Sequence, residues 1–196
     1  MSTVEIRPVT GIAVEPWLDA LAQLRIAVFR DYPYLYHGDL EYERRYLDRY
    51  AQSDRSVFVL ALEYNRLVGA ATALPLREAD EEFQVPFRQL GAELDSVFYF
   101  GESVLLKPYR GEGVGHRFFD LREQYAADFG FRHTAFCAVT REEAHPARPA
   151  DYQPLDRFWR SRDYFPQNQL VAHFDWTDVG DSAPSRKAMQ FWLHSL

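Results

Sequence analysis

The sequence predicts an α/β fold in which a mixed, mostly antiparallel and twisted sheet has helices on both faces. The central residues 96–139 show the pattern strand, glycine-rich turn, helix, strand, and a helix between two strands makes them parallel neighbours. Hairpin patterns lie on both sides of this unit and make the other strands antiparallel. With 196 residues, 47% hydrophobic and 26% charged, the chain fits a single domain over 1–196.

The elements before this centre follow from the spacing of apolar residues, which differs between strands and helices. Tyr64-Asn65-Arg66 joins two apolar runs and is a hairpin signal. Residues 77–95 break the pattern and indicate an insertion between strands. The predicted elements are a strand over 4–8, a helix from Pro16, a tyrosine-rich loop over 31–38, a helix over 40–50, and strands over 56–63 and 67–74.

The centre and the C-terminal part of the chain are equally regular. An apolar stripe follows one side of the helix 115–129, and Gly130 is a good stop signal for it. The polar segment 178–187 predicts a flexible connection. The predicted elements are strands over 96–106 and 133–139, a proline-containing loop over 141–153, a helix over 156–164, and closing strands over 170–176 and 188–196.

The bulk composition disfavours several classes of function. A formal charge of −7 argues against a general nucleic-acid binder, and no apolar run is long enough to span a membrane. Cys137 is the only cysteine, which excludes an internal disulfide and is typical of an inert buried thiol. The histidines show no metal-ligand spacing, so no metal site is expected. Because the N-terminus lacks a signal-peptide pattern, the expected compartment is the cytoplasm.

The turn at residues 110–115 has the properties of an anion site. Glycine allows the backbone to adopt positive φ and to approach a ligand closely. The first amides of the helix that follows have no partner within the helix and, with the helix dipole, favour a pyrophosphate. The turn lacks the Gly-Lys-Ser/Thr ending of a nucleotide-binding P-loop. A tight turn without a ligand is the structural alternative.

The residues from Val104 to Gly115 closely resemble the acyl-CoA-binding signature of the GNAT superfamily, and the order of elements fits over nearly the whole chain. The resemblance implies a GNAT-like fold, acetyl-CoA (acyl-CoA) as co-substrate, an amine acceptor and no metal. It also implies that backbone N–H groups stabilise the developing oxyanion where the signature strand bulges, at Leu105 or Leu106. The implied cofactor-binding residues are Leu105, Leu106, Arg110, Gly111, Glu112, Gly113, Val114, Gly115, His116 and Trp159.

Two features depart from the family's pattern. The gap between Pro108 and Arg110 is one residue shorter than usual, so the entry into the turn differs. The late helix of the family often has a tyrosine that protonates the departing thiolate, and Trp159 occupies that place here. An indole N–H is a poor acid, which puts the usual general acid in doubt.

Catalysis requires a group that removes a proton from the acceptor amine. Glu102 is the predicted base, because it lies on the apolar strand just before the turn, where partial desolvation is expected. The alternative is a glutamate that faces outward or is bound to an arginine. Tyr152, in the loop 141–153, is the predicted replacement for the missing tyrosine acid.

The acceptor has to be inferred from the variable parts of the chain. The resemblance implies that the loop between the first two helices lines its pocket, so we expect Tyr32, Tyr34 and Tyr36 there, and His145 is expected to touch the acceptor because it lies in the loop 141–153. The acidic segment 78–82 either attracts a cation or is a solvated loop. The leading hypothesis is an N-acetyltransferase that acts on a primary amine of a small molecule. Acetylation of a protein amine and a non-catalytic acyl-CoA sensor are the alternatives. The sequence is compatible with a homodimer.

Overall fold

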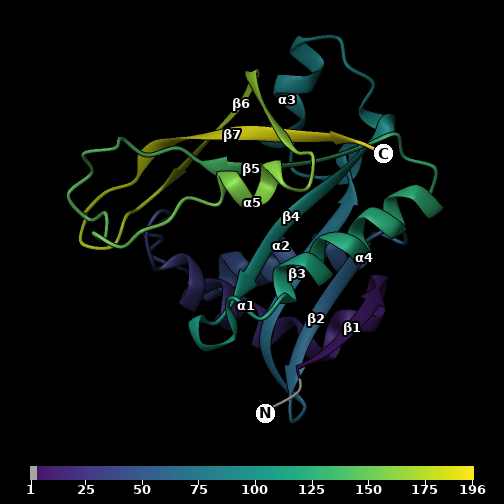
Figure 1. Cartoon of the computed structure of the whole chain (residues 1–196), viewed down its shortest axis with the longest axis horizontal. Coiled ribbons are helices and arrows are strands. Elements are labelled where there is room, and N and C mark those ends of the chain that lie inside the picture. Colours follow the sequence, from purple (N-terminus) through teal and green to yellow (C-terminus); the bar gives the residue numbers. More distant parts are fainter. Residues whose placement is uncertain (1–3) are drawn as a thin grey trace.

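A computed structural model describes residues 4–196, in which seven strands form one sheet in the order β1-β2-β3-β4-β5-β7-β6 (Figure 1). The neighbours β4 and β5 are parallel and all other neighbours are antiparallel, which confirms the predicted mixed sheet. The strands are β1 (Glu5–Thr10), β2 (Val57–Glu63), β3 (Arg66–Pro75), β4 (Val97–Leu105), β5 (His133–Val139), β6 (Phe165–Trp176) and β7 (Ser185–Ser195).

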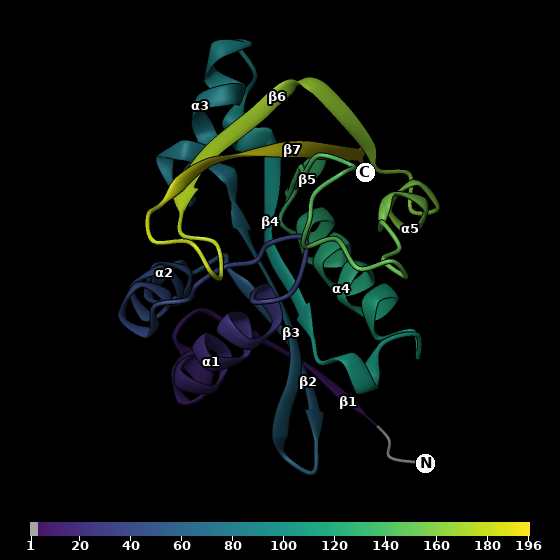
Figure 2. The ribbon, with the colours of Figure 1, turned by 90° about the vertical axis from the view of Figure 1, so that its left-hand side faces the viewer.

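Helices cover both faces of the sheet. Figure 2 shows α1 and α2 on one side of β3 and β4, with α4 and α5 on the other. Alternation along β2 explains the two cores, because Phe58 and Leu60 pack toward α1 and α2 while Val57 and Val59 pack toward α4. The helices are α1 (Leu18–Phe29), α2 (Leu40–Gln52), α3 (Glu81–Gln89), α4 (Val114–Asp128) and α5 (Asp156–Arg160), with short 3-10 segments η1 (Gly11–Trp17), η2 (Leu76–Glu78), η3 (Leu94–Ser96) and η4 (Lys107–Tyr109).

The parallel pair β4 and β5 separates early. It pairs only where Val97–Tyr99 lies beside His133–Ala135. In Figure 1, β5, β6 and β7 run across the top of the molecule at a steep angle to β1–β4. Among the strands of residues 4–196, none therefore pairs with the C-terminal half of β4 on its β5 side. We call this opening the split.

The two largest errors in the predicted boundaries lie in the C-terminal part of the chain, and the last strand also begins earlier, at Ser185 rather than at residue 188. The helix expected over 156–164 ends at Arg160, because the chain then turns through Asp163, which has a positive φ of 60°. The first closing strand begins at Phe165 rather than Leu170. Its pairing with β7 is irregular between Pro166 and Val171, so the usual alternation is absent there.

The segment predicted as an insertion forms η2, α3 and η3. Its helix α3 packs on the closing hairpin, with the Phe83 ring 4.7 Å from the Phe174 ring and the Phe87 ring 5.0 Å from that of Phe191. These contacts fix one end of β6 over the α1–α2 face. Within residues 4–196, no helix combines the length and apolar content needed to cross a bilayer.

Candidate functional site

The glycine-rich turn presents free backbone amides, as its sequence predicts. Gly111 and Gly113 have φ of 83° and 81°, and a Cβ at either position would have no heavy atom within 4 Å. The first amide that bonds back to the cap of α4 is Arg117 N–H, which donates to Gly113 O at 3.3 Å. Over residues 4–196, no hydrogen bond from the amides of Gly111 to His116 is present. They form an open cradle that fits a pyrophosphate.

The short helix α5 packs beside this turn through Phe158 rather than Trp159. A Cβ at Gly115 would lie 3.6 Å from a ring carbon of Phe158. Trp159 turns toward the core, and its ring centroid is 5.0 Å from that of Phe136 and 4.9 Å from that of Trp192. The residue with a direct contact to the turn is thus one position earlier than expected.

Two polar side chains of the turn, those of Arg110 and His116, contact the protein itself. Arg110 donates from Nε to the carbonyl oxygen of Leu105 at 2.9 Å, and His116 Nδ1 lies 3.2 Å from a guanidinium nitrogen of Arg162. Glu112 is exposed, whereas the side chain of Val114 is buried and anchors the start of α4. The anion site of this turn therefore consists of backbone.

The signature strand β4 bulges earlier than predicted. Gly101 and Glu102 together face the single residue Thr72, because the register shifts between Ala71 and Ala73. The oxyanion donors were expected at Leu105 or Leu106, at the bulge.

The amides of Leu105 and Leu106, at the end of β4, differ in whether they are already hydrogen-bonded to β3. The amide of Leu106 is already used, since it donates to Val68 O at 3.0 Å. Strand amides alternate in direction, so the neighbouring amide of Leu105 faces the split. The expected bulge at Leu105 or Leu106 and the role of the Leu106 amide were wrong, while Leu105 stays a prediction.

A buried arginine supports the bulge from the α4 face. The Arg122 guanidinium donates to the carbonyl oxygens of Thr72 at 3.2 Å and Glu102 at 3.1 Å, and to Ser103 Oγ at 2.8 Å. Burial lowers the pKa of Arg122 to about 10, so the group remains charged at neutral pH. Arg122 therefore links the helix that follows the turn to the strand at the split.

Glu102 is bound to an arginine, which is the alternative to its predicted role as base. Its side chain is only 1% exposed, and its Oε2 pairs with Arg25 and lies 3.2 Å from the hydroxyl of Tyr46. Arg25 also pairs with Glu43, which is equally buried. The basicity of Glu102 stays a prediction.

A cavity of about 400 Å³ opens on the α1–α2 face and is bounded at the sheet by Tyr99 and Gly101. Tyr34 and Tyr36 line it as predicted, whereas Tyr32 is not part of its wall. The other aromatic side chains of the wall include Phe29, Tyr42, Tyr46, Phe83, Phe174 and Trp176.

The cavity wall is acidic as well as aromatic. Glu43 and Asp80 line it, together with Asp39 and Asp175 at its edge. Asp80 belongs to the acidic segment 78–82, for which a solvated loop was the alternative. Glu78 and Glu81 of that segment follow the alternative and pair with arginines at the surface.

A model of the acetyltransferase (GNAT) family matches residues 19–150. This chain belongs to the GNAT acetyltransferase family. The matched residues include both helices beside the cavity, the strand β4, the glycine-rich turn and the helix α4. No curated protein sequence matches the chain.

Solved structures confirm the GNAT fold. The chain is similar to an N-acetyltransferase from Staphylococcus aureus Mu50, with 14% identity, TM-score 0.61 and 99% of each chain covered. It is similar to a ribosomal-protein-alanine N-acetyltransferase from Brucella melitensis, with 16% identity, TM-score 0.61, and 98% and 99% covered. Arabidopsis thaliana NAA60, solved with a bisubstrate analogue, shares 12% identity at TM-score 0.61 with 99% of each chain covered.

Three residues predicted at the site of this GNAT domain gather in a second cluster. The Tyr32 ring lies 4.7 Å from Tyr152 and 5.8 Å from His145, measured between centroids. Burial and then the neighbouring Tyr32 raise the pKa of Tyr152, so its hydroxyl keeps its proton at neutral pH. The loop before α2 and the loop after β5 therefore meet here, outside the wall of the cavity.

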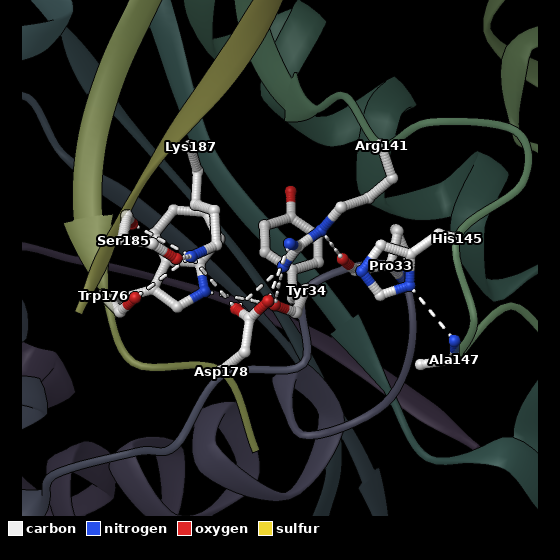
Figure 3. A network of polar contacts seen from close by, with 9 residues as sticks. All are labelled: Pro33, Tyr34, Arg141, His145, Ala147, Trp176, Asp178, Ser185 and Lys187. Atoms are coloured by element: carbon white, nitrogen blue, oxygen red, sulfur yellow. Dashed lines mark hydrogen bonds and ion pairs between the residues drawn. The ribbon is translucent and has the colours of Figure 1, made fainter. Parts of the chain in front are cut away.

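A polar network that the sequence did not suggest fixes the cavity wall (Figure 3). Arg141 donates from Nε to Pro33 O at 2.8 Å and from Nη2 to Tyr34 O at 2.7 Å, and it forms a bidentate pair with Asp178. Lys187 lies 3.3 Å from Asp178 and donates to Trp176 O at 3.1 Å.

These contacts join three segments that are distant in sequence. Burial opposes the charge of Asp178, but the hydrogen bonds and charges of Arg141 and Lys187 outweigh it and hold the pKa of Asp178 below its usual range. Trp176 also donates from Nε1 to Tyr34 O at 3.1 Å. The segment 178–187, predicted to be a flexible connection, is therefore anchored at both ends. No local pattern pointed to this, because each residue alone looks like a surface charge.

Cys137 is the inert buried thiol that its strand predicts. Burial raises the pKa of the Cys137 thiol to about 12, and its sulfur lies 3.3 Å from the hydroxyl of Tyr99. A thiol with such a pKa is protonated at neutral pH and is not a nucleophile.

Proposed function

We propose that this GNAT domain transfers an acetyl group from acetyl-CoA to a primary amine of a small molecule. The observation that supports it most is the cavity of about 400 Å³ beside the bulge of β4, because this volume suits a small molecule. The free amides from Gly111 to His116 lie beyond the end of the same strand and would hold the pyrophosphate of the co-substrate.

The reaction forms a bond between the amine nitrogen and the acetyl carbonyl carbon and breaks the bond from that carbon to sulfur. The amine loses a proton, for which Glu102 is the predicted acceptor, and the Leu105 amide is the candidate donor to the carbonyl oxygen. The departing thiolate takes a proton from Tyr152 or from water. A thiol has a pKa of about 8.5, so this leaving group needs little help from an acid.

A protein amine is the second candidate acceptor. One structural neighbour is a ribosomal-protein-alanine N-acetyltransferase, and at 16% identity the likeness concerns the fold. A sensor without catalysis is the third candidate, and Trp159 in the place of the family's tyrosine favours it.

The test is release of free CoA thiol from acetyl-CoA by the purified protein, with a panel of small primary amines and a panel of peptides. Release with small amines and not with peptides is the expected result. Release with peptides alone would establish the second candidate. Tight acetyl-CoA binding without transfer to any acceptor would establish the sensor.

A further inference from the structure

We propose that the preferred acceptor has a second nitrogen, which stays protonated in the acidic wall of the cavity while the first nitrogen is acetylated. The ligand class is thus a diamine rather than a simple alkylamine. This inference rests on the proposed function and adds a determinant of specificity, Glu43, to the same cavity.

The first observation is an excess of buried negative charge. Glu43 and Glu102 share one guanidinium, that of Arg25, and both carboxylates have side chains only 1% exposed. Within residues 4–196, Glu43 Oε1 and Glu102 Oε1 have no hydrogen-bond partner. Burying a charge without a partner costs free energy, so this group of three residues lacks one cation.

The second observation is that Glu43 is one of the residues that line the cavity. Burial, then the charge of Glu43 and a hydrogen bond to its carboxylate, raise the pKa of Tyr36, and burial, Asp80 and Glu43 raise that of Tyr42. Both carboxylates therefore act on the same stretch of wall. Asp80 also pairs with Arg49, which lies outside the wall, whereas Glu43 Oε1 is unpaired.

The third observation concerns the aromatic rings of the wall. Phe83 lies 4.6 Å from Tyr99 and 4.7 Å from Phe174 between centroids, and no cation of residues 4–196 is placed over any of these three rings. Aromatic faces attract ammonium groups when water is excluded. The wall thus combines unpaired carboxylate oxygen with aromatic surface, and this is the chemistry that recognises an organic cation.

The identity of that cation follows from the reaction. The nitrogen that attacks the thioester has to be neutral, and a wall that favours its protonated form would slow the transfer. The missing positive charge consequently belongs to a different nitrogen of the same acceptor. A rival explanation is that Glu43 removes the proton from the reacting nitrogen. In that case, Glu43→Gln would lower kcat/KM equally for acceptors with and without a second charge.

The experiment compares cadaverine with n-pentylamine, which have the same chain length and differ in the second amine. We would measure kcat and KM for both, and equilibrium binding of both in the presence of CoA, for the unaltered protein and for Glu43→Gln. Glu41→Gln is the matched control, because Glu41 lies on the same helix α2 and is exposed outside the cavity. Removing one partner of a buried charge pair typically costs tenfold or more, so we expect a kcat/KM preference for cadaverine of at least about tenfold that Glu43→Gln abolishes.

Each outcome decides the proposal. Equal kcat/KM for the two amines in the unaltered protein would overturn it, and this comparison holds even if Glu43→Gln does not fold. An equal loss for both amines in Glu43→Gln would also overturn it and assign Glu43 to proton removal. If neither amine is acetylated, the panel of acceptors described above decides the proposed function separately. Tighter binding of cadaverine than of n-pentylamine, lost in Glu43→Gln, would still support the inference, and equal binding would contradict it.

Discussion

The two sides of β4 are built on different principles. On the α4 side, the candidate site consists of backbone amides that one turn presents, and the side chains of Arg110 and His116 bind elsewhere. On the α1–α2 side, the cavity consists of side chains from segments as distant as Tyr34 and Trp176. A backbone site of this kind serves a ligand common to a whole family, while a side-chain site is free to differ between members.

The largest expected effect tests the backbone side. Replacing Gly113 with valine puts a β-branched residue at a φ of 81° and a side chain into the cradle, so affinity for CoA should fall by roughly 10²-fold or more. Calorimetry measures this directly. Gly91→Val is the matched control, because Gly91 has a φ of 68° and open space around its Cβ but lies between α3 and β4. Unchanged affinity in a folded Gly113→Val protein would refute the cradle.

The next effect tests where the two sides meet. Glu102→Gln keeps the shape of the side chain and removes its basicity, so kcat should fall about 10²-fold if Glu102 is the base. The KM for acetyl-CoA should stay the same. A pH–rate profile with the same midpoints in variant and unaltered protein would remove Glu102 from proton transfer and leave it as a partner of Arg25.

The third effect concerns the link between the two sides. Arg122→Met deprives the carbonyl oxygens of Thr72 and Glu102 of a donor, so the free energy of unfolding should fall by about 3 kcal/mol. The turnover of the remaining folded protein should fall too, because the bulge loses its support. Urea unfolding and kcat are the measurements, with Arg45→Met, an exposed arginine of α2, as control. Loss of stability with unchanged kcat would show that the link is purely structural.

The fourth effect tests the cavity wall alone, through the polar network of Arg141. Arg141→Met releases the carbonyl oxygens of Pro33 and Tyr34 and should raise the KM for the acceptor roughly tenfold, with the KM for acetyl-CoA unaltered. Steady-state kinetics with each substrate varied in turn separate the two. The exposed Arg186→Met on β7 serves as the control. Equal changes in both KM values would mean that the network holds the whole domain and not this wall.

The smallest effect depends on pH. The folded-state pKa of Asp178 is lowered, so its contribution to stability is complete above the ordinary aspartate pKa of about 3.9 and is lost as the pH falls through the lowered value. The urea midpoints of the unaltered protein and Asp178→Asn should therefore differ at about pH 6 and converge below about pH 4. A constant difference across this range would contradict the role of the Asp178 charge.

The same contrast explains what the sequence could predict. The turn was visible because its glycines, their spacing and the strand before them are local, and the sheet followed from hairpin patterns and one parallel unit. The Arg141–Asp178 pair was not visible, because only the fold brings the two residues together. The bulge at Gly101 was misplaced for a related reason, since pairing with β3 determines it. Tyr34 and Tyr36 were found because the resemblance implied that the loop between the first two helices lines the acceptor pocket, while Tyr32 contributes to the neighbouring cluster.

Gly101 has a consequence for how this domain can diverge. A Cβ at this position would lie 2.5 Å from the Tyr50 hydroxyl oxygen and 2.6 Å from Thr72 Oγ1, so the sheet side of the cavity admits no side chain there. Mutation can therefore reshape the cavity only through its other walls, which the helices α1, α2 and α3, the loop before α2 and the closing hairpin supply. Descendants of this protein would exchange one acceptor for another by changing those walls, while the strand beneath them stays constant.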